Sequence, residues 1–211
     1  MNGSTPWRIM LYKTFSVIEL GGNVLDVGGS RRADYHRLFK GSPRFYTANL
    51  DVAEKPDILC DLEKGIPAPG EQYDGIISLN TIEHLYDARA VLKEMFRVLK
   101  PGGAIVVAVP FLVQIHPSPR DYARYSGESL ERFLKEAGFN NIKIVSIGRG
   151  PFTACSQILH NTLAIAPLRI ITYIIAMALD SILLFTARLI GRTENFGNKS
   201  YPLGFLVTAV K

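Results

Sequence analysis

The chain has 211 residues, of which 47% are hydrophobic and 20% charged. This length suits one domain with its own core, and the composition excludes a disordered chain. The net charge of +5 is spread along the sequence rather than gathered beside aromatic residues, which disfavours a nucleic-acid groove. The two cysteines, Cys60 and Cys155, have no C-x-x-C spacing, so we expect a reduced, cytoplasmic protein without a disulfide framework or a metal site.

Strand patterns and helix patterns alternate along the chain, which predicts an α/β fold with a mostly parallel sheet. The predicted strands are the apolar runs at 23–27, 44–51, 56–62, 73–80, 102–110, 141–148 and 203–211. An amphipathic helix is predicted to end at Lys100, before "PGG", and a second to run from Ser126 to Ala137.

The first four predicted strands end in polar side chains, namely Asp26, Asp51, Asp61 and Asn80. In open α/β sheets ligands bind beyond the carboxyl ends of the strands. Gly28 and Gly29 follow Asp26, and glycines let a backbone approach a ligand closely. Asp51 comes 23 residues after Gly28, close to the offset of about 20 at which an acid meets ribose hydroxyls. An acid ahead of the glycines disfavours a pyrophosphate, and the absence of G-x-G-x-x-G disfavours an NAD(P) dehydrogenase.

Five segments together resemble the class I S-adenosylmethionine-dependent methyltransferases of the type 11 kind, over about residues 20–148. They are "VLDVGG", "NLDV", "CDLEKGIP", "YDGIISLNTIEHLYD" and "VLKEMFRVLKPGGAIVVAVP". The resemblance implies a Rossmann-like seven-stranded sheet whose last strand is antiparallel, with 203–211 between the fifth and sixth strands. It also implies S-adenosyl-L-methionine as the cofactor. The implied cofactor-binding residues are Asp26, Gly28, Gly29 and Ser30 for the methionine half, Asp51 for the ribose, Asp61 and Leu62 for the adenine, and Asn80 beside the sulfonium. The chain departs from the family pattern at Ser30 and Arg32, where further glycines are usual.

The segment "PFLVQIHPSPRDYARYS" (110–126) leaves the sheet at the same edge, so we expect it to overhang the transferred methyl group. It is similar to a loop of a methyltransferase subgroup linked to cell-surface glycan synthesis. The candidate catalytic residues are His116, Asp121 and Tyr122, and the candidate substrate-binding residues are His84, Arg120 and Arg124. The alternative for this loop is structural, with an Arg–Asp pair bracing it and His116 at the surface.

The segment 152–200 is predicted to be an apolar helical insertion before the last strand, and 166–191 within it is apolar nearly all round. Its length approaches that of a membrane span, although Asp180 interrupts it. A single crossing would leave 203–211 on the wrong side of the membrane for pairing with 141–148. The remaining interpretations are a lid or hairpin packed on the domain, a homodimer interface, or a membrane-surface element. For the last of these, Arg169, Arg188 and Arg192 lie at the margins.

The sequence therefore predicts a single methyltransferase domain over 1–211. We expect it to transfer a methyl group to a small or lipid-linked acceptor, with a glycan precursor as one candidate. It would be cytoplasmic, with peripheral contact at the inner face of the membrane as one arrangement. The alternative is a non-catalytic cofactor-binding or interaction module that uses the apolar insertion to hold a partner.

Overall fold

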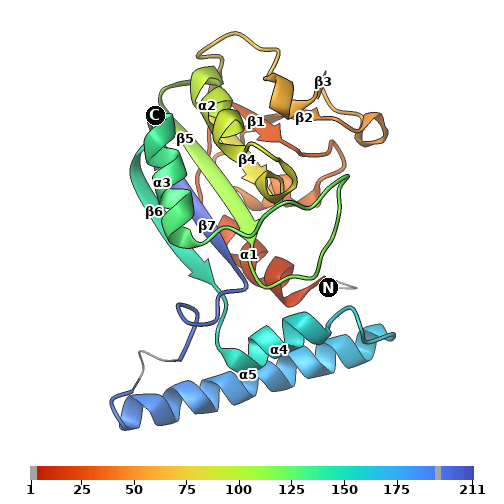
Figure 1. Cartoon of the computed structure of the whole chain (residues 1–211), viewed down its shortest axis with the longest axis vertical. Helices are drawn as coiled ribbons and strands as arrows, with labels where there is room; N and C mark the ends of the chain where they lie inside the picture. The colour runs from red at the N-terminus through yellow and green to blue at the C-terminus, as the bar shows by residue number, and fades with distance from the viewer. Residues whose placement is uncertain (1–3, 193–195) are drawn as a thin grey trace.

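The computed structural model describes residues 4–192 and 196–211, which form a seven-stranded sheet in the order β3-β2-β1-β4-β5-β7-β6 (Figure 1). The strands are β1 (Asn23–Val27), β2 (Arg44–Asn49), β3 (Ile58–Leu59), β4 (Tyr73–Leu79), β5 (Leu99–Pro110), β6 (Asn140–Ile147) and β7 (Gly204–Val210). The α-helices are α1 (Pro6–Phe15), α2 (Ala88–Val98), α3 (Gly127–Ala137), α4 (Pro151–Leu159) and α5 (Ala166–Leu189). Short 3-10 turns are η1 (Asp34–Leu38), η2 (Val52–Glu54), η3 (Leu62–Lys64) and η4 (Ile82–His84).

The sheet has the predicted topology. β7 pairs antiparallel with both β5 and β6, whereas β1 pairs parallel with β2 and with β4. The chain moves outward from β1 to β3 and then returns to β4 beside β1, so the strand order reverses between β1 and β4. Ligands of open α/β sheets bind at such a reversal, beyond the carboxyl ends of the strands.

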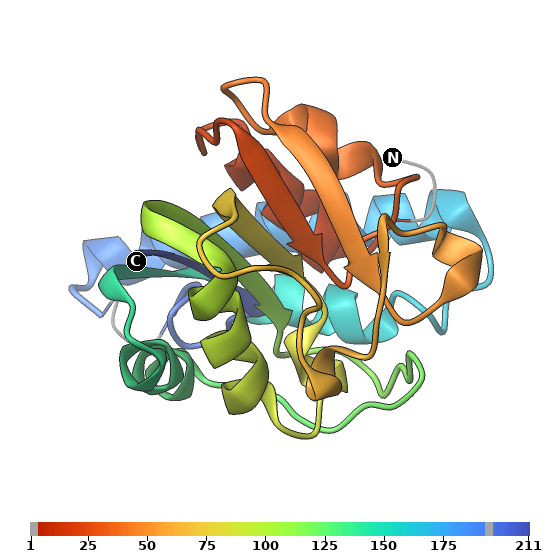
Figure 2. The same cartoon turned by 90° about the horizontal axis from the view of Figure 1, so that it is seen from above.

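Both faces of the sheet are buried (Figure 2). Alternate residues point to opposite faces of a strand, so neighbours such as Ile76 and Ile77 join different cores. Ile76 packs in the core that includes side chains of α2 and α3, and Ile77 packs in the core that includes Trp7 and Leu11 of α1. Apolar runs without alternation, as in "YDGIISL", are typical of such doubly covered strands.

The helix that was predicted to end at Lys100 ends at Val98, because β5 already begins at Leu99 and includes the Pro-Gly-Gly turn signal. Two strand boundaries also differ from the sequence prediction, for a common reason. The expected strand at 56–62 is only Ile58–Leu59, and the expected strand at 44–51 stops at Asn49. Asp51 and Asp61 each accept a hydrogen bond from the backbone two residues later and so begin the turns η2 and η3. Carboxylate caps of this kind compete with strand pairing. The sequence prediction also missed α1, which begins after the N-cap Thr5.

The predicted apolar insertion forms the helices α4 and α5, with α4 lying between α5 and the rest of the molecule (Figure 1). Asp180, in the middle of α5, is fully buried against the first turn of α4. Its carboxylate accepts hydrogen bonds from the backbone N–H of Phe152 (3.0 Å) and Thr153 (2.8 Å), and from the Thr153 hydroxyl. The residue before α4 is Gly150, which has no side chain that could accept a hydrogen bond from the first turn of the helix. A Cβ at this position would lie 2.5 Å from Asp180 Oδ1. Asp180 of α5 therefore caps the N-terminus of α4 and holds the two helices together.

α5 is long and apolar enough to cross a membrane by length and composition, and only 17% of its apolar window is buried. Its position in the fold excludes a crossing, because the strands on either side of the insertion, β6 and β7, pair with each other. The chain after α5 would have to return through the bilayer, and the stretch between Leu189 and Gly204 is shorter than the about 20 residues that a helical span needs. α5 therefore lies along the molecule with an apolar face exposed.

Candidate functional site

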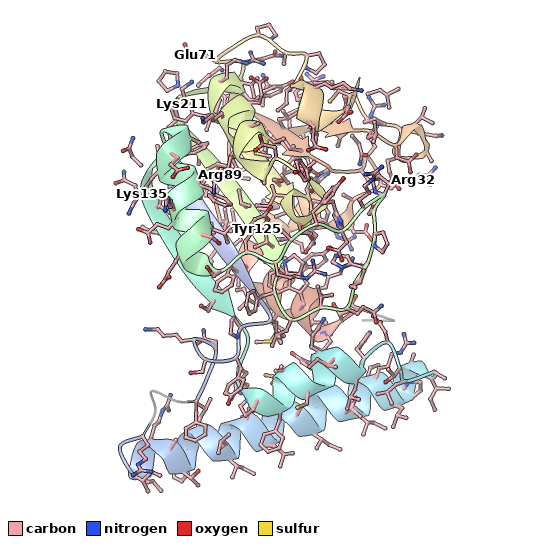
Figure 3. The ribbon with its side chains drawn as sticks, in the orientation of Figure 1. Arg32, Glu71, Arg89, Tyr125, Lys135 and Lys211 are labelled. Atoms are coloured by element: carbon pink, nitrogen blue, oxygen red, sulfur yellow. The ribbon has the colours of Figure 1, made fainter. Side chains whose placement is uncertain are left out.

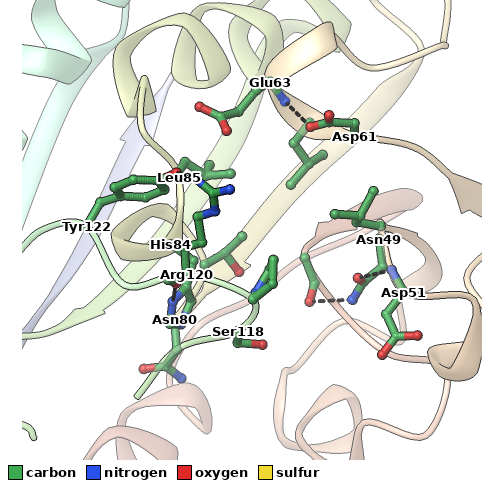
Figure 4. A pocket seen from close by; sticks show the side chains of 15 residues that line it. Asn49, Asp51, Asp61, Glu63, Asn80, His84, Leu85, Ser118, Arg120 and Tyr122 are labelled. Atoms are coloured by element: carbon green, nitrogen blue, oxygen red, sulfur yellow. Dashed lines mark hydrogen bonds between the residues drawn. The ribbon is translucent and has the colours of Figure 1, made fainter. Parts of the chain in front are cut away.

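A cavity of about 660 Å³ lies at the carboxyl ends of β1, β2 and β4, where the strand order reverses. Its size is typical of small-molecule sites. Three groups of residues line it (Figure 4): the strand ends and turns at Gly28, Asn49, Leu50, Asp51, Asp61, Leu62 and Glu63; the turn at Asn80, Thr81, His84 and Leu85; and the loop residues Ser118, Pro119, Arg120 and Tyr122. Asn49 and Asp51 lie across the cavity from His84, Arg120 and Tyr122.

The two adjacent glycines are required by their surroundings. Gly28 has a φ of +82°, and a Cβ on it would lie 2.3 Å from the side chain of Thr81. A Cβ on Gly29 would lie 2.0 Å from the carboxyl group of Asp26. A side chain at either position would displace the cavity wall, so the tight turn after β1 depends on these glycines.

Asp26 lies beneath this turn and does not line the cavity. It is fully buried, and its Oδ2 accepts a hydrogen bond from the Tyr35 hydroxyl and lies 2.7 Å from Nε2 of His36. Burial raises the pKa of the Asp26 carboxyl, and the bonds to His36 and Tyr35 lower it only in part. Its second oxygen, Oδ1, is buried without a hydrogen-bond partner among the described residues. A buried acceptor without a partner directly below a ligand-facing turn suits a cationic group of a ligand.

Asn49 joins the glycine turn to the next strand end, a role that sequence reasoning missed. Its Nδ2 donates to the carbonyls of Gly28 and Gly29, both at 3.0 Å, and its Oδ1 accepts from the backbone N–H of Asp51. The only signal in the sequence was its place two residues before Asp51 at the end of an apolar run.

Asp51 and Asp61 both line the cavity and also cap turns. Oδ1 of Asp51 accepts from the N–H of Ala53 at 2.8 Å, and Oδ1 of Asp61 accepts from the N–H of Glu63 at 3.2 Å. Each carboxylate is thereby held in one orientation at the cavity wall. A carboxylate that is fixed by its own turn can accept hydroxyl or amine hydrogen bonds from a ligand with little further loss of entropy.

Asn80 lines the cavity from the end of β4 and has a left-handed φ of +53°. Its Oδ1 accepts a hydrogen bond from Nε1 of Trp7 at 2.8 Å, and the backbone N–H of Trp7 donates to Gln157 Oε1 on α4. α1 therefore connects the cavity wall to the α4–α5 pair. Sequence reasoning missed Trp7, because 73 residues separate it from Asn80.

The loop over the cavity is braced by a half-buried ion pair. Asp121 accepts two hydrogen bonds from the Arg124 guanidinium, at 2.5 and 2.7 Å, and one from the backbone N–H of His116 at 2.8 Å. The bonds from Arg124 are the main reason that the pKa of Asp121 lies well below its usual range. This is the bracing pair that the sequence left as an alternative for these residues.

The structure brings most, but not all, of the predicted site residues together. Those that line the cavity are Gly28, Asp51, Asp61, Leu62, Asn80, His84, Arg120 and Tyr122. Those that do not are Asp26, Gly29, Ser30, His116, Asp121 and Arg124. Gly29 belongs to the glycine turn, Asp26 lies against it, and Ser30 accepts a hydrogen bond from the N–H of Arg32. The catalytic assignments of His116, Asp121 and Tyr122 stay predictions, and of these three residues only Tyr122 lines the cavity.

A Rossmann-like sheet with acids such as Asp51 and Asp61 in a cavity at the topological reversal is typical of the class of proteins that bind nucleoside-containing ligands there. The family model described as "Methyltransferase domain" matches residues 10–144. The chain therefore belongs to the methyltransferase-domain family.

Two curated proteins with similar sequences are methyltransferases by name. An O-methyltransferase from Aspergillus sclerotiorum is 29% identical over 92 residues, which are 39% of this chain and 35% of that protein. A probable S-adenosylmethionine-dependent methyltransferase from Mycolicibacterium smegmatis is 31% identical over 80 residues, which are 35% of this chain and 31% of that protein. The chain thus matches about a third of the length of these curated relatives.

Solved structures share the fold at low identity. An Archaeoglobus fulgidus SAM-dependent methyltransferase has a TM-score of 0.55 at 18% identity, over 98% of this chain and 92% of that chain. The Haemonchus contortus phosphoethanolamine N-methyltransferase 2, in complex with S-adenosyl-L-methionine, has a TM-score of 0.58 at 18% identity, over 97% of this chain and 51% of that chain.

Proposed function

We propose that this protein is an S-adenosyl-L-methionine-dependent methyltransferase that binds its cofactor in the cavity at the β1–β4 reversal. The observation that carries the proposal is the pair of fixed carboxylates, Asp51 and Asp61, facing Asn80 across a cavity whose glycine turn admits no side chains. This arrangement occurs in a chain of the methyltransferase-domain family.

Each residue has a role that follows from its chemistry. Asp51 accepts hydrogen bonds from the two ribose hydroxyls, and Asp61 with Leu62 holds the adenine. Asp26 Oδ1, which has no hydrogen-bond partner among the described residues, is the candidate acceptor for the ammonium group of the aminoacyl part, whose positive charge would favour the ionised carboxylate. Gly28 lets the backbone come close enough for contact.

The cofactor, when bound, supplies a methyl group on a sulfonium that is already a good leaving group, so the protein mainly has to align the acceptor. On the acceptor side of the cavity, Arg120 Nη1 donates to the Tyr122 hydroxyl at 3.2 Å. The remaining guanidinium donors of Arg120 suit a phosphate or carboxylate on the acceptor. His84 lies in the same wall, and its Nδ1 is 2.6 Å from the Arg120 carbonyl, which fixes the backbone of the loop.

We further propose a lipid-linked acceptor, with a glycan precursor as the candidate, and docking of α5 on an anionic membrane surface. Large apolar side chains are exposed along one face of α5, among them Ile174 (59%), Ile182 (61%) and Phe185 (62%). The sticks of α5 project away from the rest of the molecule (Figure 3). Arg188 and Arg192 are exposed at its end, where they can meet lipid phosphates. No described residue of α4 or α5 lines the cavity, so these two helices do not form part of the cavity wall.

Calorimetric titration with S-adenosylmethionine tests the cofactor proposal. The wild-type chain should bind one equivalent, and Asp51→Asn should bind about 10- to 100-fold more weakly, because it loses charged hydrogen bonds worth about 1.5–3 kcal/mol. Asp34→Asn is the matched control, since the side chain of Asp34 is 85% exposed and outside the cavity. Equal affinities for wild type and Asp51→Asn would contradict the ribose role.

Transfer of a labelled methyl group then tests the activity. With intact protein, label should enter the lipid fraction of a cell extract. If the cofactor binds but no fraction becomes labelled, the chain is a non-catalytic cofactor-binding module instead.

Membrane docking is tested separately by co-sedimentation with vesicles. Binding should require anionic lipid and should weaken with salt. A stable dimer in light scattering together with no binding to vesicles would assign the α5 face to a second copy of the chain.

A further inference from the structure

Three side chains of the types that bind metal ions lie close together at the acceptor side of the cavity. Glu83 and His84 come from η4, and His116 comes from the loop over the cavity. One ligand atom of each lies within 4.8 Å of the others. Oε1 of Glu83 is 3.7 Å from Nε2 of His84 and 3.7 Å from Nε2 of His116. Sequence reasoning expected no metal site, because it searched for cysteine spacing, and His84 and His116 are 32 residues apart.

Glu83 is the unusual member of this cluster. It is fully buried, and neither of its carboxylate oxygens has a hydrogen-bond partner among the described residues. A buried carboxylate without partners is costly, and separations of 3.7 Å are too long for hydrogen bonds to the two imidazoles. They do suit a shared ion. With metal–ligand bonds of about 2.1 Å in tetrahedral geometry, neighbouring ligand atoms lie about 3.4 Å apart.

Both imidazoles are oriented with their ligating nitrogens toward this carboxylate. Nδ1 of His84 is 2.6 Å from the Arg120 carbonyl oxygen, and Nδ1 of His116 is 3.0 Å from the Gln114 carbonyl oxygen. A carbonyl can only accept, so in the neutral rings each Nδ1 carries the proton and each Nε2 presents its lone pair to Glu83. Metal-binding histidines are held in this way by a backbone acceptor on the other ring nitrogen.

We propose that Glu83, His84 and His116 bind one divalent transition-metal ion, with Zn²⁺ as the best match. Two imidazoles and one carboxylate are the donor set of zinc and of related ions, whereas Mg²⁺ and Ca²⁺ prefer oxygen ligands alone. Three protein ligands leave a fourth position open. His116, whose side chain is 32% exposed, provides the entry path from solvent.

The ion would connect η4 to the loop over the cavity. That loop contributes Ser118, Arg120 and Tyr122 to the cavity lining, and His84 is itself part of the lining. Metal binding would therefore fix the acceptor side of the site while leaving the Asp51 side unchanged. This consequence rests on the proposed function, whereas the binding of the ion does not.

The test uses the full chain without a histidine tag, treated with EDTA and then desalted. Titration with ZnCl₂ should show one site with a Kd of about 1 μM or tighter, and MgCl₂ should show none. Co²⁺ should give the visible absorption of a low-symmetry site. His116→Gln and Glu83→Gln should each weaken Zn²⁺ binding at least about 100-fold, because each removes a ligand. The double variant Cys60→Ser/Cys155→Ser should bind like wild type.

Two results would overturn the proposal: no binding of Zn²⁺ or Co²⁺ by the wild-type chain, or unchanged binding by His116→Gln. His116→Gln is the deciding variant, since its partly exposed side chain can be replaced without emptying the core, and circular dichroism checks its fold. Titration of the metal-free chain with S-adenosylmethionine runs in parallel. If the wild-type chain binds S-adenosylmethionine but no Zn²⁺, the metal site alone is refuted. If it binds Zn²⁺ but no S-adenosylmethionine, the cofactor proposal alone is refuted.

Discussion

Replacement of Asp180 by alanine should destabilise the protein strongly, although the residue lies in a helix that is apolar nearly all round. Its carboxylate accepts from two backbone N–H groups and one hydroxyl at the start of α4. Alanine would leave both N–H groups without an acceptor and the Thr153 hydroxyl with only the Met177 sulfur, at 3.8 Å. A buried donor left unsatisfied costs about 1–3 kcal/mol, and local relaxation recovers part of the sum. We expect a loss of about 3–5 kcal/mol.

For a chain of this size, about 1 kcal/mol corresponds to about 2–4 °C in Tm, so Asp180→Ala should melt about 6–20 °C lower by scanning calorimetry. Asp180→Asn keeps one acceptor oxygen and should lose about half as much. Asp34→Asn, an exposed acid, should change Tm by less than about 1 °C. A Tm of Asp180→Ala close to that of wild type would refute the account of Asp180 as the cap that joins α4 to α5.

Three further outcomes test other parts of the structure. Gly28→Ala should weaken S-adenosylmethionine binding at least about tenfold in calorimetry, because alanine is strained at a φ of +82°; unchanged affinity would remove the glycine turn from the site. Trp7→Phe should lower cofactor affinity several-fold, because it removes the donor that orients Asn80, and an NMR shift of the Asn80 side-chain amide should accompany it. The double variant Arg188→Glu/Arg192→Glu should reduce partitioning onto anionic vesicles at least about tenfold while cofactor binding stays the same, and equal partitioning would exclude electrostatic docking.

The sheet could be predicted from the sequence because each strand is a short apolar run that ends at a turn signal. The strand order and the antiparallel last strand, implied by the family resemblance, were confirmed. Asp51, Asp61 and Asn80 line one cavity because the ends of parallel strands meet at one edge of the sheet.

Side chains that depend on distant partners could not be predicted. Asp26 lies below the glycine turn because its hydrogen-bond partners, Tyr35 and His36, come from the turn η1, which has no sequence periodicity. Asp180 was visible as an irregularity in an apolar segment, but its partners precede it by 27 and 28 residues. Local patterns carry no information about such contacts.

The cluster of Glu83, His84 and His116 was missed for a similar reason. The loop that carries His116 has no regular structure, and its path back to η4 is fixed by backbone hydrogen bonds from Tyr122 and Ala123 to the Glu83 carbonyl rather than by any repeat. His116 was predicted to be catalytic because the loop was expected over the methyl group, and no local pattern places it beside the Glu83 carboxylate.

The central claim is that the cavity between the Asp51 and Asn80 sides holds S-adenosylmethionine. The most direct measurement is calorimetric titration of the full chain with this cofactor, alongside NADH as a ligand that carries a pyrophosphate. The account predicts one site for S-adenosylmethionine, weakened by Asp51→Asn and unaffected by Asp34→Asn, and no binding of NADH. Binding of NADH in place of S-adenosylmethionine, or no binding of either, would contradict it.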